Sequence, residues 1–558
     1  MNTKNSLARM FLLVIAFGIM GSVFSQISHG GVPASIKFSI VNEDFPVFEL
    51  PVPDVERLLA EDAVTDKYGI PMRFAECFAV DFDLAADGKW LNMPEGSRIC
   101  RLALHADRAQ AVLLYYKTFH IPKGGKLFLY DAEKRQVIGA FDHTTNSNGG
   151  VFATEMIYGE KIILEYVEPY GLKEKPEVII SEAGYVYRTV KSPHGERGFG
   201  GSGDCEVNVN CPEGDEWQDQ KNAVCRMIVK QGSSSVWCTG VLVNNTRQDG
   251  TPYLISADHC GANATPTEMN TWVFYFRYEG PGCENPSSDS AFNSYTMVGA
   301  SKVAAAGGAG VKSDFKLIKL NEVVPEDYHP YFAGWDRTGE TSSHGVTIHH
   351  PQGDIRKIST YDTPLQSTNW GTTPNTHWKV VWIETENGNG VTEGGSSGSP
   401  IFDNNGRMIG QLTGGDSGCS NLLGHDYYGK FSYSWDEVGD ADTLQLKPWL
   451  DPDNTGVEKI DGISLTGIGE KKSVRTVAVY PNPTDGMISI DVGNLYGTTV
   501  SIEVFNSTGQ KVLEKTYQHL SFSYITVDLT HVVPGIYFLK LIIGGTVYKT
   551  KILKQKKY

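Results

Sequence analysis

Residues 390–402 read GVTEGGSSGSPIF, a glycine-rich turn that leads directly into an apolar run. A serine at such a turn can expose its hydroxyl, and a glycine-rich backbone can aim two N–H groups at one point, as an oxyanion requires. Ser397 is therefore a candidate nucleophile, with the N–H groups of Gly395 and Ser397 as candidate oxyanion donors. The pattern is weak by itself, because Gly-Ser loops are also common linkers.

A nucleophilic serine needs a base, and the segment SADHC places His259 directly after the apolar run YLIS. Asp314, in SDFKLIKL, begins an apolar run that predicts a buried strand. A partly desolvated carboxylate there would hold an imidazole by its second nitrogen. The chain order His259, Asp314, Ser397 is that of chymotrypsin, and it differs from the orders in subtilisins and α/β-hydrolases.

The pattern of short apolar runs and glycine turns predicts an all-β chain. Residues 200–463 contain short runs such as VWCTGVLVN and WVFYFRY between glycine turns, which favour two packed β-barrels or sandwiches, with a short terminal helix near 444–450. Alternating runs such as RLALHA and KIILEYVEP predict a β-sandwich in residues 26–199. A linker at 464–475 precedes a further small β-sandwich at 476–558.

Composition limits the possible partners. The 558 residues are too many for one hydrophobic core. Sixty-five acidic against 49 basic residues give a formal net charge of -16, which disfavours nucleic acid and weakly favours a cationic substrate. His349-His350 has no third ligand close in sequence, so we expect a structural pair, and neither a metal nor another cofactor.

The amino-terminal 25 residues predict export. Lys4 and Arg9 precede an almost wholly apolar run from Phe11 to Phe24, the pattern of a cleaved signal peptide. The run is short for a membrane-spanning helix, the alternative interpretation, and we expect no transmembrane segment in the mature protein. Nine cysteines in an exported protein imply disulfides, and the odd count leaves at least one thiol unpaired. Spacing alone does not give their connectivity.

A set of ordered segments supports a closer assignment of residues 200–462. The segments are CEVNVNCPEGD (205–215), CTGVLVNNT (238–246), LISADHCG (254–261), SDFKLIKLN (313–321), AGWDR (333–337), IHHPQGDIRKIS (348–359), GVTEGGSSGSPIF (390–402), GQLTGG (410–415) and WLDPDNTG (449–456). Together they resemble the lysyl endopeptidase family. The resemblance implies a chymotrypsin-like double β-barrel and a secreted serine endopeptidase with the triad His259, Asp314 and Ser397.

The same resemblance implies a disulfide framework. The implied pairs are Cys205–Cys419, Cys211–Cys283 and Cys238–Cys260. Cys225 would remain a free, buried thiol, and a pairing of Cys77 with Cys100 stays open.

Cleavage after a basic residue is the predicted specificity. Trypsin-like enzymes keep an acid six residues before the nucleophile, but Val391 stands there. The resemblance points instead to Asp426, in HDYYGKF, as the acid that pairs with a substrate lysine, and the alternative is a solvated loop acid.

Further substrate-binding residues follow from the family. Trp370, in STNWGTT, matches the tryptophan that stacks near the catalytic histidine. Family members place a histidine before the Gly414-Gly415 pair, and this chain has Thr413 there. Because of that departure, an arginine-directed or mixed specificity stays open.

The flanking regions suggest maturation and sorting. Residues 26–199, joined by the exposed linker KSPHGERGFGGSGD, are expected to be an inhibitory and folding propeptide, released by cleavage after Lys191 or Arg197. The carboxyl end contains VYPNPTDGMISI, FNSTGQKV and VPGIYFLKL, and it resembles the immunoglobulin-like sorting domain of type IX secretion.

That likeness implies export across an outer membrane, then release or attachment to the cell surface. A carbohydrate-binding or adhesive β-sandwich is the alternative for the tail. The expected partners are protein and peptide substrates and the secretion machinery, and we expect a monomer. The main rival from another functional class is an inactive homologue that acts as a surface-binding protein.

Overall fold

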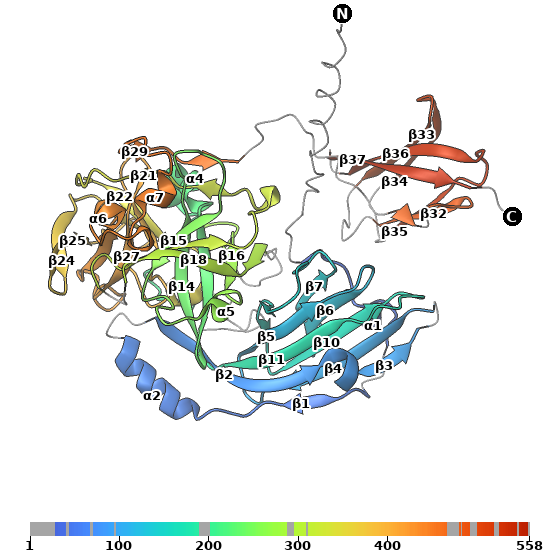
Figure 1. The fold of residues 1–558 in the computed structure, drawn as a ribbon, viewed down its shortest axis with the longest axis horizontal. Helices are drawn as coiled ribbons and strands as arrows, with labels where there is room; N and C mark the ends of the chain where they lie inside the picture. The colour runs from blue at the N-terminus through green and yellow to red at the C-terminus, as the bar shows by residue number, and fades with distance from the viewer. Residues whose placement is uncertain are drawn as a thin grey trace, which may run out of the picture. The chain divides into compact units, whose positions relative to one another are not determined.

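The computed structural model describes residues 28–40, 44–66, 71–93, 96–188, 201–286, 295–307, 311–465, 479–480, 482–491, 499–517, 524–543 and 546–555. They form two compact units, one of the described residues from 44 to 464 with Ser28, and one of the described residues from 465 onward with residues 29–40 (Figure 1). The predicted signal peptide at 1–25, the candidate cleavage positions Lys191 and Arg197, and nearly all of the linker 464–475 lie outside the described residues.

Strands dominate both units, as the sequence predicts, so the all-β class is confirmed. The helices are α1 (Ala34–Lys37), α2 (Val55–Thr65), α3 (Leu84–Asp87), α4 (Gln218–Lys221), α5 (Pro266–Met269), α6 (Phe431–Asp436) and α7 (Lys447–Leu450). The sequence reading missed α2, which begins where the Asp54 side chain accepts a hydrogen bond from the backbone N–H of Arg57. The predicted terminal helix is present, but it is confined to α7.

The amino-terminal part of the first unit is a β-sandwich, as predicted. Its strands are β1 (Val47–Glu49), β2 (Met72–Asp83), β3 (Lys89–Asn92), β4 (Arg98–His105), β5 (Ala111–His120), β6 (Lys126–Asp131), β7 (Val137–Phe141), β8 (Phe152–Ala153), β9 (Ile157–Tyr158), β10 (Lys161–Glu168) and β11 (Glu177–Val186). One layer has the order β1-β4-β10-β6-β7, and β2, β11 and β5 lie in the other. The layers meet through apolar rings, because Phe48 stacks on Phe82 at 4.3 Å and Phe119 meets Phe141 at 6.0 Å.

The second layer of this sandwich continues into the region that carries His259. Strand β14 pairs with β2, and Figure 1 shows the two running alongside each other. The resulting 12-stranded sheet contains, besides β2, β5, β8, β9 and β11, the strands β13 (Val224–Gln231), β14 (Ser234–Leu242), β15 (Tyr253–Ala257), β16 (Val273–Phe276), β17 (Tyr295–Val298), β18 (Ala300–Ala305) and β19 (Phe315–Leu320). Residues on both sides of the predicted boundary at 199 and 200 therefore share one sheet.

A 10-stranded sheet holds the region around Ser397. Its strands are β12 (Val207–Asn208), β21 (Trp335–Asp336), β22 (Gly345–His349), β23 (Lys357–Tyr361), β24 (Gln366–Trp370), β25 (Thr373–Val380), β26 (Pro400–Phe402), β27 (Met408–Gly415), β28 (Asp426–Lys430) and β29 (Lys459–Ile460). A short pair joins β20 (Tyr331–Phe332) to β30 (Ile463–Ser464). Among the described residues, no strand pair closes either large sheet into a ring.

The second unit contains the predicted carboxy-terminal β-sandwich. Its strands are β31 (Val479–Tyr480), β32 (Met487–Asp491), β33 (Val500–Asn506), β34 (Lys511–Tyr517), β35 (Tyr524–Asp528), β36 (Gly535–Ile543) and β37 (Thr546–Lys554), in sheets of the orders β31-β32-β35 and β34-β33-β36-β37. One cluster of buried side chains from both sheets, including Ile490 and Leu541, forms the core. In the described part of the chain, no helix has the length and apolar character needed to cross a membrane.

Candidate active site

Two neighbouring strands bring His259 and Asp314 together. Strand β15 ends just before His259, β19 begins just after Asp314, and the antiparallel pairing sets Ala257 opposite Phe315. The Nδ1 atom of His259 lies 2.6 Å from Oδ2 of Asp314, and the backbone N–H of His259 donates to Oδ1 at 3.0 Å. Both carboxylate oxygens of the fully buried Asp314 thus fix the imidazole, which directs Nδ1–H toward the acid and leaves Nε2 to accept a proton.

Ser397 lies next to this pair. Its carbonyl oxygen accepts the backbone N–H of Thr239 at 2.8 Å, and the Sγ atom of Cys260 is 3.7 Å from the same oxygen. The residue after His259 therefore contacts Ser397 directly. In the described residues, Nε2 of His259 is buried without a hydrogen-bond partner, so no hydrogen bond to the Ser397 hydroxyl is present. Catalytic hydrogen bonds of ligand-free enzymes are often long and tighten only when substrate binds.

The turn around Ser397 requires its glycines. Gly395 and Gly398 have φ of 96° and 86°, a region that favours glycine. A Cβ on Gly398 would lie 2.2 Å from the Ser256 hydroxyl, so no larger side chain fits after the candidate nucleophile. The carbonyl oxygen of Gly394 accepts the backbone N–H of Gln352 at 2.5 Å. The peptide between Gly394 and Gly395 is trans, so the N–H of Gly395 points away from Gln352. The hydrogen bond thus fixes the direction of this N–H, as an oxyanion donor requires.

The buried side chain of His349 forms hydrogen bonds that support the glycine-rich turn. Nδ1 of His349 lies 2.8 Å from the Ser396 hydroxyl and Nε2 lies 3.1 Å from that of Ser359. Burial lowers the pKa of His349 to about 3, so its ring is neutral at physiological pH. The neighbouring His350 places Nδ1 at 2.9 Å from the Asp354 carbonyl oxygen. Both side chains therefore form hydrogen bonds within the fold.

Asp426 is buried at the start of β28, with 1% of its surface exposed, so the alternative of a solvated loop acid is wrong. Its Oδ2 accepts hydrogen bonds from neutral donors on three other segments, and its Oδ1 is buried with no partner among the described residues. Burial raises the pKa of Asp426, while these hydrogen bonds oppose that rise. The arrangement leaves one acceptor for a cationic group. The Val391 side chain is also fully buried and offers no charge.

Thr413 lies beside a histidine that the sequence reading missed. Its Oγ1 is 2.9 Å from Nε2 of His377, whose Nδ1 is 2.8 Å from the Thr376 hydroxyl. Burial lowers the pKa of His377 to about 4, so this ring is also neutral near pH 7. The ring of Trp370 lies 5.8 Å from His377 and 5.3 Å from Tyr427. Among the described ring contacts, none joins Trp370 to His259.

Thr413 stands where the resemblance leads us to expect a histidine. His377 on β25, which β28 separates from β27, forms a hydrogen bond with this threonine. Alternation in TPNTHWKV places residue 377 on the face of Asn375 and Lys379, opposite Trp378 and Val380, so no local pattern predicts that His377 is buried.

Three disulfides tie the region together, and they are the pairs that the resemblance implies. They join Cys205 to Cys419, Cys211 to Cys283 and Cys238 to Cys260. The last pair fixes the residue beside His259 to β14. Cys77, Cys100 and Cys225 are free and buried, so the open question of a Cys77–Cys100 bond is answered in the negative.

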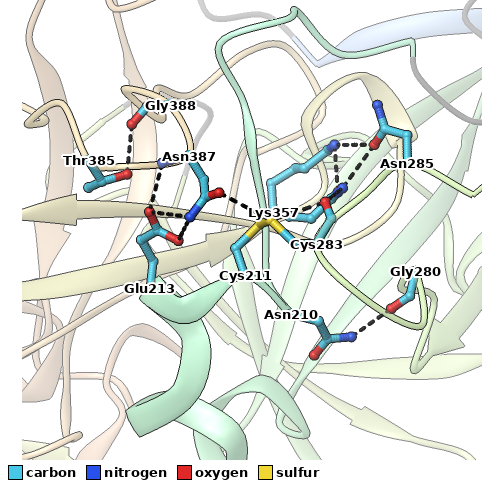
Figure 2. Close-up of a disulfide and its surroundings, with 11 residues drawn as sticks. Asn210, Cys211, Glu213, Gly280, Cys283, Asn285, Lys357, Thr385, Asn387 and Gly388 are labelled. Atoms are coloured by element: carbon cyan, nitrogen blue, oxygen red, sulfur yellow. Dashed lines mark hydrogen bonds between the residues drawn. A yellow bond between two sulfur atoms is a disulfide. The ribbon is translucent and has the colours of Figure 1, made fainter.

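Figure 2 shows the surroundings of the bond between Cys211 and Cys283. The Glu213 carboxylate accepts hydrogen bonds from the backbone and side chain of Asn387, and the Lys357 ammonium donates to Asn285 at 3.3 Å. The contacts of Glu213 with Asn387 connect the amino-terminal segment of the protease region to the loop that follows β25.

The amino-terminal sandwich reaches the turn that carries Ser397. Strand β2 pairs with β14 in the register Trp237 opposite Met72, and Phe74 stacks on Trp237 at 3.9 Å with 12° between the planes. A Cβ built on Gly394 would lie 3.2 Å from the Met72 side chain. Met72 therefore packs directly against the glycine-rich turn. No local pattern predicts this contact, because pairing between strands far apart in the chain depends on both partners.

Comparison with known proteins finds two families whose models match parts of this chain. Residues 199–429 match the family model of the lysyl endopeptidase C-terminal domain, and residues 478–555 match that of the secretion system C-terminal sorting domain. A lysyl endopeptidase of Pseudomonas aeruginosa PAO1 is 25% identical over 373 residues, which cover 63% of this chain and 76% of that protein.

Solved structures give weaker similarities. A Glu endopeptidase bound to MPD has a TM-score of 0.26 and 15% identity, and covers 41% of this chain and 93% of its own. The HtrA-type protease AlgW with a decapeptide has a TM-score of 0.27 and 11% identity, and covers 62% and 98%. From the family models and the curated relative, the chain is an exported serine protease, in which residues 199–429 are similar to the lysyl endopeptidase C-terminal domain and residues 478–555 to a secretion system sorting domain.

Proposed function

We propose that this protein is a secreted endopeptidase that cleaves peptide bonds after lysine through the triad His259, Asp314 and Ser397. The observation that carries the proposal is the fixed imidazole of His259. Both oxygens of a fully buried carboxylate hold the ring and its backbone, while Nε2 has no partner within the described residues. This is the arrangement that a general base beside a serine requires.

In the proposed mechanism, the Ser397 hydroxyl attacks the scissile carbonyl while Nε2 of His259 takes its proton. The backbone N–H groups of Gly395 and Ser397 stabilise the tetrahedral oxyanion, a contribution of about 3 kcal/mol per donor. His259 then returns the proton to the leaving amine, which yields an acyl-enzyme on Ser397. A water molecule, deprotonated by the same imidazole, attacks the ester and releases the second product.

Asp426 supplies the proposed preference for a basic residue. A buried carboxylate with one unpaired oxygen is costly unless a cation reaches it, and a substrate lysine ammonium meets that requirement. Trp370, Gly414 and Gly415 form the proposed surroundings of the bound side chain, next to Thr413. A preference for arginine or for both residues is the second candidate, and its motivation is the threonine at 413.

We propose that residues 26–199 are a propeptide that holds the protease domain, residues 200–463, in a latent form. Support comes from the strand pairing of β2 with β14 and from the contact of Met72 with Gly394, because a substrate must reach this turn. Cleavage after Lys191 or Arg197 would separate the two parts of the chain. Residues 476–558 would then direct the protein to the type IX secretion machinery and be removed or attached at the surface.

Covalent labelling of the processed protein with a fluorophosphonate tests the proposed chemistry. The wild type should react at Ser397, and Ser397→Ala should not react. A matched control is Ser399→Ala, which removes a nearby buried hydroxyl and should still be labelled. A folded, processed wild type that does not react would contradict the catalytic proposal and favour the rival of an inactive, surface-binding homologue.

A further inference from the structure

The two oxygens of Asp426 have different environments. Oδ2 accepts hydrogen bonds from Nε1 of Trp382 at 2.6 Å, from Oγ1 of Thr392 at 2.8 Å and from Oγ of Ser417 at 2.6 Å. The donors come from three separate segments, after β25, before the Ser397 turn and after β27. Each carboxylate oxygen has about two lone-pair sites, so three donors fill the hydrogen-bonding capacity of Oδ2.

Oδ1 is buried, and it has no hydrogen-bond partner among the described residues. A Cβ added to Gly415, which lies opposite Asp426 in the β27–β28 pair, would be 2.0 Å from this oxygen. A side chain at position 415 would therefore occupy the position next to Oδ1, which only a glycine leaves free. No described lysine or arginine of the chain forms an ion pair with Asp426, and the three donors are neutral, so none of these contacts neutralises the carboxylate.

A lysine ammonium and an arginine guanidinium use such a carboxylate differently. The ammonium is a compact point charge that can be held by one acceptor oxygen. The guanidinium presents a planar fork whose strongest pairing uses both carboxylate oxygens in parallel. With Oδ2 occupied, a substrate arginine can reach only Oδ1, and part of its guanidinium is left without an acceptor. A substrate lysine needs only one acceptor oxygen, so its pairing with Oδ1 is not weakened.

We propose that Trp382, Thr392 and Ser417 are positioning residues that set selectivity for lysine over arginine by occupying one oxygen of Asp426. The inference rests on the proposed role of Asp426 in substrate binding and deepens it. The three residues do not contact the reacting atoms. They hold the carboxylate rotated so that a single oxygen faces the substrate side chain.

The test compares kcat/KM for matched peptides with lysine or arginine at the cleaved position, using processed enzyme. Thr392→Val removes a donor at nearly constant shape, and Ser417→Ala removes a second. The double variant should raise the arginine-to-lysine ratio of kcat/KM on the order of tenfold, mainly through KM. Thr392→Ser keeps a hydroxyl at that position and should restore the wild-type ratio.

Thr385→Val is the matched control, because it makes the same change at a hydroxyl that donates to the Gly388 carbonyl oxygen and not to Asp426. Each variant must label with fluorophosphonate at the wild-type rate, which separates altered selectivity from damage to the fold. The pH profile is a further measurement, since the hydrogen bonds from Thr392 and Ser417 lower the pKa of Asp426. Their removal should move the acid limb for lysine substrates to higher pH.

The outcomes separate the two proposals. A lysine-cleaving wild type whose ratio is the same in Thr392→Val, Ser417→Ala and the double variant would overturn the role of the three donors and leave Asp426 untouched. A labelled wild type that cuts after neither lysine nor arginine would overturn the basic specificity and this inference together. A ratio that rises equally in Thr385→Val would also count against it.

Discussion

The neutral, buried His377 makes a quantitative prediction about acid stability. Its pKa is lowered from 6.5 to about 4, with burial as the main cause. As pH falls through 6.5 the unfolded chain binds a proton at this position, but the folded chain does not bind one until about pH 4. The stabilisation is therefore complete above 6.5 and is lost as pH falls toward 4. At pH 4.5 the loss is roughly 2–3 kcal/mol for this one residue.

The perturbation is His377→Gln, which keeps a polar side chain between Thr376 and Thr413 but does not titrate. Both proteins carry Ser397→Ala to prevent self-cleavage. Urea unfolding is followed by tryptophan fluorescence at pH 7.0 and 4.5. All 10 tryptophans lie between Trp90 and Trp449, so the signal reports on the first unit and not on the sorting domain.

The expected result is a double difference. Wild type should lose roughly 2–3 kcal/mol more than the variant between the two pH values, whatever the absolute stability of either protein. Other buried groups with shifted pKa, such as His349, titrate equally in both proteins and cancel. Equal losses in the two proteins would refute the assignment of His377 as a buried, neutral ring.

Three further predictions concern the candidate active site and the amino-terminal sandwich that packs against it. Asp314→Asn should lower kcat about 10⁴-fold with little change in KM, because the amide favours the wrong imidazole tautomer, and steady-state kinetics on processed enzyme would show it. Asp426→Asn should remove most cleavage after basic residues in peptide assays while fluorophosphonate labelling persists, and retained lysine cleavage would exclude the assigned role. Phe74→Ala removes a fully buried ring from the β2–β14 contact at a cost of about 3–5 kcal/mol, so unprocessed chain should label at least tenfold faster. An unchanged labelling rate would indicate that β2 does not restrain the site.

Much of the fold could be predicted because its signals are local. Period-two alternation, glycine turns and apolar runs identify strands without reference to their partners, and the all-β class follows from them. The glycine turn around Ser397 is equally local, since the constraint on Gly398 comes from the shape of the turn and its close neighbours. The order of His259, Asp314 and Ser397 then suggested a triad.

The parts that were missed depend on contacts between distant segments. The pairing of Met72 with Trp237 requires an edge strand in one region and a matching strand in another, and neither has a distinctive local pattern. His377 and the donors to Asp426 have no distinctive pattern in the sequence. Only the fold brings His377 to the Thr413 hydroxyl and the donors to Oδ2 of Asp426. Helix α2 was missed because its apolar face is narrow, with Leu58 fully buried while its other apolar side chains stay largely exposed.

The most direct test of the central claim is mass-spectrometric mapping of the cuts that the processed protein makes in a denatured protein mixture. The proposed function predicts cuts after lysine, few after arginine, and none with Ser397→Ala. Cuts mainly after glutamate or apolar residues, or the same cuts from the Ser397→Ala protein, would contradict it.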